Sequence, residues 1–141
     1  KKLPLERFSL SREPQILLPG IISTGEISSR INIKDRFFDD PEGKFADLIM
    51  DDQALFFETN KGIVVVLGCC HAGLEMTLNK VKELSGNKKI YMVIGGMHLN
   101  SASEEIKMQT VNVLKKFSVK KIGLSHCTGF YGIKILLKHF P

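Results

Sequence analysis

Three of the four histidines in this chain each follow a short apolar run. His71, His98 and His126 come directly after the segments GIVVVLGCC, IYMVIGGM and KIGLS. Such segments are typical of buried strands, and the carboxyl ends of strands are where α/β folds bind their ligands. Because three imidazoles delivered to one edge of a sheet can meet at a metal ion, the repetition predicts a metal or catalytic site there.

The first segment runs into a turn of small residues, GCCHAG at positions 68–73. Small residues such as Gly73 let a ligand approach the backbone closely, and the helix predicted to follow offers free N–H groups to an anion. The positive end of that helix disfavours a protonated His71, which favours a neutral imidazole that can bind a metal. A tightly packed turn with a buried histidine is an equally weighted alternative.

His98 and His126 lie in turns of the same kind, GGMHL and SHCTG. For His98 the alternative is a glycine turn with the imidazole hydrogen-bonded in the core. The turn around His126 combines a potential ligand, a hydroxyl group and the start of a helix, and there we favour a function. His139 lies near the end of a predicted helix, where a positive charge suits the dipole, so we expect it at the surface. The pair Asp51-Asp52 is interpreted as a turn, with a position facing the site as the alternative.

All three cysteines lie beside the candidate site histidines. Cys69 and Cys70 are adjacent and cannot easily pair with each other, and Cys127 directly follows His126. An odd number of cysteines, with no secretion signal in the sequence given, predicts reduced thiols. Metal contact or redox sensitivity is one interpretation, and buried inert thiols are the default for at least two of them.

The elements that must position these residues follow from the hydrophobic pattern. An interrupted or edge strand is expected over 16–24, broken by Pro19-Gly20, and a long loop over 26–43. Further strands are predicted over 45–50, 53–58, 63–67, 90–94 and 120–124. A helix after the first turn has Leu74, Leu78, Val81 and Leu84 on one face. A capping box at 101–104 opens the next, with Ile106, Thr110, Val113, Leu114 and Phe117 inward, and a last helix covers 129–140.

These elements predict an α/β (α+β) fold, a mixed sheet with helices on one face, in a single domain over 1–141. Residues 1–44 are expected to be irregular and loop-rich, and 45–141 to form the regular β/α core. The strands over 63–67 and 90–94 are apolar at nearly every position, so their second face must also be covered. The first half of the chain encodes too little helix for this. We therefore expect a missing layer, supplied by absent residues or by a partner chain; a homo-oligomer is compatible with the sequence.

Composition excludes several classes of protein. The 141 residues are 43% hydrophobic and 25% charged, as in a globular domain, and no run approaches a membrane span. The net charge of +5 is interpreted as a solvated lysine-rich surface, with a rim that attracts a small anionic substrate as the alternative. Nucleic-acid binding is not expected, because no motif interleaves aromatic residues with the lysines. The sequence has no signal peptide, which predicts a cytoplasmic protein.

Five motifs together resemble a known family. DDQAL (51–55), GCCHAGL (68–74), IGGMHL (94–99) and SHCTG (125–129) occur in the order found in the metallo-β-lactamase superfamily, and PGIISTGE (19–26) also fits. The branch is the one named for 7,8-dihydropterin-6-ylmethyl-4-(β-D-ribofuranosyl)aminobenzene 5′-phosphate synthase. The resemblance covers about residues 17–131. It implies a four-layer αββα sandwich with metals at one edge between the sheets.

The resemblance also implies that this chain is a C-terminal half. The family's first signature, His-x-His-x-Asp-His, precedes these motifs and is absent. The aspartate that usually bridges two metals is missing too, so either Cys69 takes its position or His71 replaces the lost ligand; we favour His71. The implied metal ligands are His71, His126 and Cys69, with His98 as the catalytic residue. Gly73, Gly96 and Thr128 are the implied substrate-binding residues.

The function that follows is a metal-dependent hydrolase-type enzyme acting on an ester, phosphoester or diphosphate, with a pterin-related substrate as a candidate. The implied cofactor is a divalent metal, zinc in first place and manganese or iron as alternatives. Activity is expected to need the N-terminal half. The alternative is a non-catalytic truncated or split module that binds a partner chain.

Overall fold

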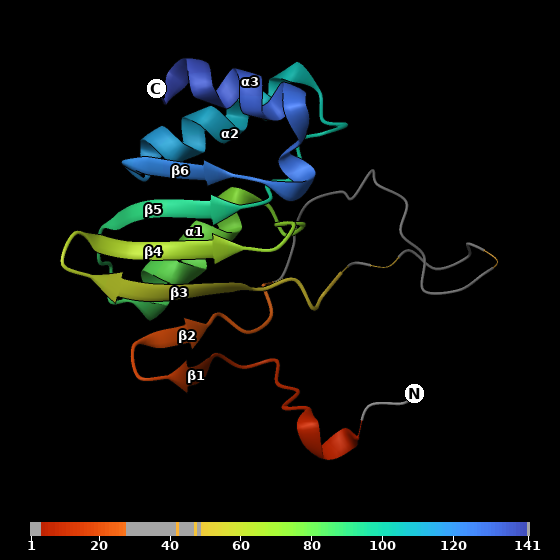
Figure 1. Cartoon of the computed structure of the whole chain (residues 1–141), viewed down its shortest axis with the longest axis vertical. Helices are drawn as coiled ribbons and strands as arrows, with labels where there is room; N and C mark the ends of the chain where they lie inside the picture. Colours follow the sequence, from red (N-terminus) through yellow and green to blue (C-terminus); the bar gives the residue numbers. More distant parts are fainter. Residues whose placement is uncertain (1–3, 28–41, 43–46, 48, 141) are drawn as a thin grey trace.

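The computed structural model describes residues 4–27, 42, 47 and 49–140, and these form one six-stranded sheet with three helices. The strands lie in the sheet in chain order (Figure 1). They are β1 (Gln15–Leu18), β2 (Ile21–Ser23), β3 (Ala54–Thr59), β4 (Gly62–Leu67), β5 (Ile90–Gly95) and β6 (Lys121–Leu124). The helices are α1 (Leu74–Leu84), α2 (Glu104–Lys116) and α3 (Gly129–His139), with short 3₁₀ turns η1 (Leu5–Arg7) and η2 (His126–Thr128).

The connections decide the strand directions. Pro19-Gly20 turns β1 back into β2, with Gly20 at φ 82°, and the residues between Thr59 and Gly62 turn β3 into β4. These tight turns give the antiparallel pairs β1–β2 and β3–β4, and β2 also pairs antiparallel with β3. Strands β4, β5 and β6 are parallel, because α1 and α2 return the chain to the same end of the sheet each time. The interrupted strand and the mixed sheet predicted from the sequence are confirmed.

The helices cover one face of the sheet. In Figure 1, α1 lies behind β3, β4 and β5, and α2 and α3 stack beside β6. One core joins this face to all three helices, through side chains that include Phe56, Val65, Val93, Leu78, Leu114 and Leu136. The face predicted for α1 is confirmed: Leu74, Leu78 and Val81 are buried.

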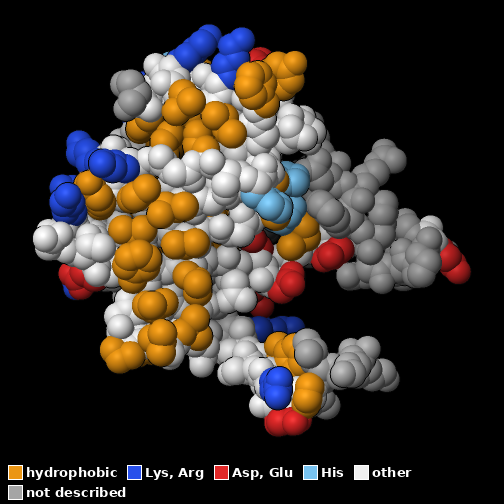
Figure 2. All heavy atoms as spheres, in the orientation of Figure 1, with side chains coloured by type: hydrophobic (Ala, Val, Ile, Leu, Met, Phe, Trp, Pro, Cys, Tyr) orange, Lys and Arg blue, Asp and Glu red, His pale blue; other side chains and the backbone are white. Residues whose placement is uncertain are grey.

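The other face of the sheet is apolar and carries no helix of the described chain. The strand register places a second set of side chains there, namely Ile21, Leu55, Phe57, Val64, Val66, Met92 and Ile94. Figure 2 shows this face in the orientation of Figure 1, with hydrophobic side chains in a continuous band across the strands. We call this set the open face. It is the uncovered side of the sheet that the sequence predicted.

Two local predictions differ from the structure. The strand predicted over 45–50 is absent at Asp47, Ile49 and Met50; residues 45, 46 and 48, like most of the long loop, lie outside the described residues. Asp47 is the reason, because its carboxylate accepts the Ile49 amide at 2.7 Å in a local turn, and Ile49 adopts φ 48°. Ile49 then accepts the Asp52 amide at 3.1 Å.

The start of α2 and one residue of its inner face were also predicted wrongly, whereas Val113 and Phe117 pack against the core as predicted. Its N-cap is Ser103, whose hydroxyl accepts the Ile106 amide at 3.3 Å, rather than Ser101. Thr110 and Leu114 are buried as predicted, but Lys107 lies inward and Ile106 is 48% exposed. Lys107 can be buried because its ammonium reaches Glu104 at 3.2 Å while its stem packs.

Among the residues that the structure describes, no helix is both long and apolar enough to cross a membrane.

Candidate metal centre

The loops that follow β4, β5 and β6 are joined to one another at the carboxyl edge of the parallel strands. The Gly96 amide donates to the Gly68 carbonyl at 3.0 Å, and the Ser125 amide donates to the Gly95 carbonyl at 3.2 Å. The Leu99 amide donates in turn to the Cys127 carbonyl at 3.0 Å. The three predicted turns therefore form one connected edge, as the sequence indicated.

Each of these loops contains a non-glycine residue in the left-handed conformation. Cys70 has φ 62°, His98 φ 46° and His126 φ 51°. This conformation is unfavourable for residues with a Cβ and persists only where surrounding contacts enforce it. Strained residues of this kind gather at ligand and catalytic sites, and three of the six in the described part of the chain lie in the three loops where the sequence placed the site.

His71 and His98 are brought into direct contact. Their ring centroids lie 4.3 Å apart, with the ring planes 51° from parallel. Both side chains are half-buried, and the Nδ1 atom of His98 is buried. Figure 2 shows histidine side chains together at this edge of the sheet. Two predicted site residues, from the loops after β4 and β5, therefore form one pair.

His126 lies with two thiols. Its Nδ1 atom is 3.5 Å from the Cys69 Sγ atom, and the Cys127 Sγ atom completes a group whose three ligand atoms all lie within 4.8 Å of one another. His126 is exposed, whereas both cysteines are half-buried. The structure thus brings the predicted ligands Cys69 and His126 together and adds Cys127, which the predicted ligand set did not include. The metal role of His71, His126 and Cys69 stays a prediction.

The donor set suits a divalent metal. In a tetrahedral zinc site, bonds of about 2.3 Å to sulfur and 2.0–2.1 Å to nitrogen place those two atoms about 3.6 Å apart. Cys69 and His126 are separated by 3.5 Å, so little movement is needed to chelate one ion. Thiolate and imidazole are also the ligands that zinc prefers.

The residues predicted to bind substrate have visible structural roles. A Cβ on Gly96 would lie 2.6 Å from the Cys127 Sγ atom and 2.6 Å from the Gly68 carbonyl oxygen, so the missing side chain makes room for the sulfur. Thr128 is buried, accepting the Met97 amide at 3.1 Å and donating to the Gly95 carbonyl at 3.4 Å. Gly73 caps α1 at φ 90°. Substrate binding by these three residues stays a prediction.

Asp52 is a site residue that sequence reasoning undervalued. Its carboxylate accepts the Ala72 amide at 2.7 Å, at the start of the segment leading into α1. The turn expected at Asp51-Asp52 is confirmed, since the Asp52 amide donates to the Ile49 carbonyl at 3.1 Å, and the carboxylate of Asp52 also faces the site loop. The signal was the acidic pair immediately before β3, the strand paired with β4.

The surroundings of Cys69 and Cys70 favour the neutral form of these two thiols. Burial raises the pKa of Cys69, and the hydrogen bond with Cys127 and the negative charges of Cys127 and Asp52 add to the rise. Burial likewise raises the pKa of Cys70 to about 12, against a lowering contribution from its hydrogen bond with Thr77. A bound cation reverses this balance by stabilising thiolates, so metal binding here releases protons and strengthens as pH rises.

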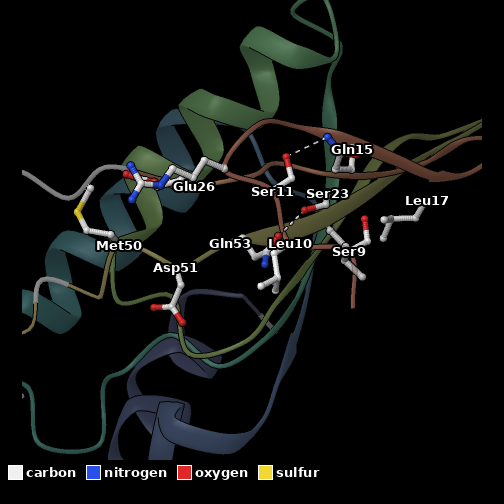
Figure 3. A pocket seen from close by; sticks show the side chains of 12 residues that line it. Ser9, Leu10, Ser11, Gln15, Leu17, Ser23, Glu26, Met50, Asp51 and Gln53 are labelled. Carbon is white, nitrogen blue, oxygen red and sulfur yellow. Dashed lines mark hydrogen bonds and ion pairs between the residues drawn. The ribbon is translucent and has the colours of Figure 1, made fainter. Parts of the chain in front are cut away.

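A separate cavity of about 920 Å³ lies between the N-terminal segment and the ends of β2 and β3 (Figure 3). Its lining is mainly polar at one side, with Arg12, Glu26 and Asp51, and includes a short hydrogen bond of 2.5 Å from Ser23 to Gln53. None of the predicted site residues lines it. Asp51, which lines it, is the neighbour of Asp52, whose carboxylate contacts the site loop.

Comparisons with known proteins identify relatives of this chain. No family model matches the chain. The 7,8-dihydropterin-6-methyl-4-(beta-D-ribofuranosyl)-aminobenzene-5'-phosphate synthase of Methanocaldococcus jannaschii is 38% identical to this chain. The alignment of 141 positions covers 95% of this chain and 48% of that protein. The chain therefore spans about half the length of this curated relative.

A crystal structure described as a metal-dependent hydrolase of the β-lactamase superfamily also matches. The TM-score is 0.77 with 27% sequence identity, covering 95% of this chain and 52% of the other. Both comparisons agree with the resemblance and the fold class inferred from the motifs. The chain has the fold of about half of a metallo-β-lactamase superfamily protein and is homologous to part of the dihydropterin-ribofuranosylaminobenzene phosphate synthase.

Proposed function

We propose that this chain is one half of a metal-dependent enzyme of the hydrolase type, acting on an ester, phosphoester or diphosphate, with a pterin-related compound as a candidate substrate. The observation that carries the proposal is the donor group at the carboxyl edge, Cys69 with His126 at 3.5 Å, beside the paired rings of His71 and His98. Similarity to a synthase and to a metal-dependent hydrolase supports it.

In this proposal different residues of the site bind the metal and act on the substrate. His71, His126 and Cys69 would hold the metal, and His98 would act on the substrate, either by stabilising developing charge or by moving a proton. A divalent ion, zinc in first place, would lower the pKa of a water toward about 7 when bound there. The strained backbone at His98 fixes the direction of its side chain before substrate arrives.

The charge around the site favours an anionic substrate. The chain carries a net charge of +5, and α1 directs its positive end at the loop that contains His71. The Ala72 amide of this loop is already occupied by the Asp52 carboxylate. An incoming anion is therefore expected to use other donors of the edge.

The second half of the active site comes from the layer that covers the open face. The chain spans 48% of its curated relative, and the open face is a sheet surface of the kind that other proteins bury. Either an N-terminal half of the same protein or a partner chain can supply that layer and the remaining metal ligands. A module that binds a partner without catalysis is the competing proposal.

Metal content and turnover of the complete protein test the proposed function. His71→Ala and His126→Ala should each lower bound metal, measured by elemental mass spectrometry, because each removes a ligand. His98→Ala should reduce hydrolysis of an activated phosphodiester more than it reduces metal content. His139→Ala, at the far end of α3, is the matched control and should change neither.

The two proposals give different results in this experiment. Unchanged metal stoichiometry in both ligand variants would remove the metal assignment. Metal binding without turnover on ester, phosphoester or diphosphate substrates would favour the partner-binding module instead.

A further inference from the structure

We propose that Cys127 is a metal ligand, and that Cys69, His126 and Cys127 form a two-thiolate, one-imidazole site for a soft divalent ion such as zinc. This inference deepens the proposed function, because it shares Cys69 and His126 with it. It adds Cys127 to the proposed ligand set, next to the paired rings of His71 and His98.

The spacing of the three donors supports one shared ion. Their ligand atoms all lie within 4.8 Å of one another, and a tetrahedral zinc site needs sulfur–sulfur separations of about 3.8 Å. Cys69 reaches the group from the loop after β4, whereas His126 and Cys127 come from η2. The left-handed backbone of His126, at φ 51°, belongs to the turn that also carries Cys127.

The surroundings of Cys127 are those of a sulfur held in place for binding. The His98 amide donates to its Sγ atom at 3.2 Å, and amide donors to sulfur stabilise ligating thiolates. Gly96 leaves the space that the sulfur occupies. The Sγ atom also lies 3.5 Å from the Cys69 carbonyl, which ties the two cysteine-bearing loops together.

Cys70 shows what a packing cysteine looks like in the same protein. It is 6% exposed, belongs to the hydrophobic core, and its Sγ atom lies 3.5 Å from the Thr77 hydroxyl of α1. Cys127 differs in each respect: it is half-buried, it faces a second thiol, and an exposed imidazole adjoins the group. This contrast is the reason to assign binding rather than packing to Cys127.

Titration with cobalt(II) under reducing conditions tests the site in the purified protein that carries the whole chain. Thiolate-to-cobalt charge transfer absorbs in the near ultraviolet, and its intensity grows with the number of thiolates bound. The wild-type protein should show the intensity expected for two bound thiolates. Cys127→Ser and Cys69→Ser should each remove about half the intensity and weaken binding at least about tenfold. Cys70→Ser is the matched control, adjacent in sequence, and should leave the spectrum unchanged.

A second measurement covers the case in which Cys127→Ser misfolds, because the sulfur of Cys127 fills the space over Gly96 in the wild type. X-ray absorption of the wild-type zinc or cobalt form counts sulfur neighbours without any substitution, and two are expected. No cobalt binding, fewer than two sulfurs, or full thiolate intensity in a folded Cys127→Ser protein would each overturn the inference.

The outcomes separate this inference from the proposed function. A two-thiolate spectrum in a protein without turnover supports the site and counts against the hydrolase-type enzyme. Turnover with no thiolate absorption leaves a metal-dependent enzyme standing but removes both Cys69 and Cys127 from the ligand set.

Discussion

The two faces of the sheet are built from adjacent residues but end in different surroundings. Phe56 points into the helix-covered core and is 2% exposed, whereas Phe57 points to the open face and is half-buried. Val65 and Val66 repeat the contrast one strand away, with Val65 fully buried. The register pairs Phe56 with Val65 and Phe57 with Val64, so each face is continuous across the strands.

This difference indicates that both faces of the sheet suit burial, whereas the helices of the described residues cover only one face. A sheet with one face in water normally alternates apolar and polar residues, and β4 does not. Its apolar run is typical of strands buried on both sides. A large exposed apolar patch marks an interaction surface, so the open face is interpreted as the surface on which a further layer packs.

The largest difference in stability between the two faces is expected from alanine substitutions at two adjacent phenylalanines. Phe56→Ala should lower the free energy of unfolding by about 3–5 kcal/mol, since it opens a cavity in the core. Phe57→Ala should cost only about 1 kcal/mol while the open face is uncovered, because a half-buried side chain loses about half its transfer energy. Urea unfolding followed by circular dichroism measures both.

The covering half provides the control for that pair. With it present, the cost of Phe57→Ala should rise toward that of Phe56→Ala, because the side chain is then buried. Equal costs in the uncovered chain would mean that the open face is already packed against something, and a cost for Phe57→Ala that the cover leaves unchanged would mean that the cover lies elsewhere.

The parts of the fold that the sequence predicted are those where local signals and tertiary packing agree. The runs ending at Leu67 and Ile94 are apolar on both faces, so their strand character and the missing layer follow together. The strand over 45–50 failed because the carboxylate of Asp47 turns the backbone locally. The inner face of α2 was predicted correctly except at its first turn, where Lys107 is buried with its ion pair to Glu104 and Ile106 is exposed; a hydrophobic pattern treats a lysine as exposed.

The candidate site shows the same division. Strand ends place His71, His98 and His126 at one edge, which periodicity alone can predict. Their grouping depends on loop conformation: the left-handed backbone at His98 and His126 decides that one ring meets His71 and the other meets Cys69. Such dihedral angles carry no clear sequence signal, because only glycine and asparagine adopt them readily.

A smaller difference in stability between the two faces is expected when a valine is replaced by threonine, which has the same shape but carries a hydroxyl group. Val65→Thr should destabilise the protein by about 1–3 kcal/mol, since its hydroxyl is buried without water. Val66→Thr, on the open face, should stay within about 0.5 kcal/mol, as for most accessible positions. Both substitutions keep a β-branched side chain, so strand propensity is held nearly constant. Similar costs for the two variants in the uncovered chain would contradict the assignment of faces.

The smallest effect compares the adjacent thiols Cys69 and Cys70 in the metal-free protein. Cys70 points into the helix layer, and burial raises its thiol pKa to about 12, so at pH 8 almost none of it is the reactive thiolate. Cys69 lies at the open edge; burial and its neighbours raise its pKa as well, but the side chain is accessible to reagent. Iodoacetamide labelling followed by peptide mass spectrometry should modify Cys69 at least about tenfold faster, with a rate that rises with pH as the thiolate forms. Metal should protect Cys69 and leave Cys70 unaffected, because only the former belongs to the donor group. Faster labelling of Cys70 would show that α1 separates readily from the sheet, and the covered face would then be no more secure than the open one.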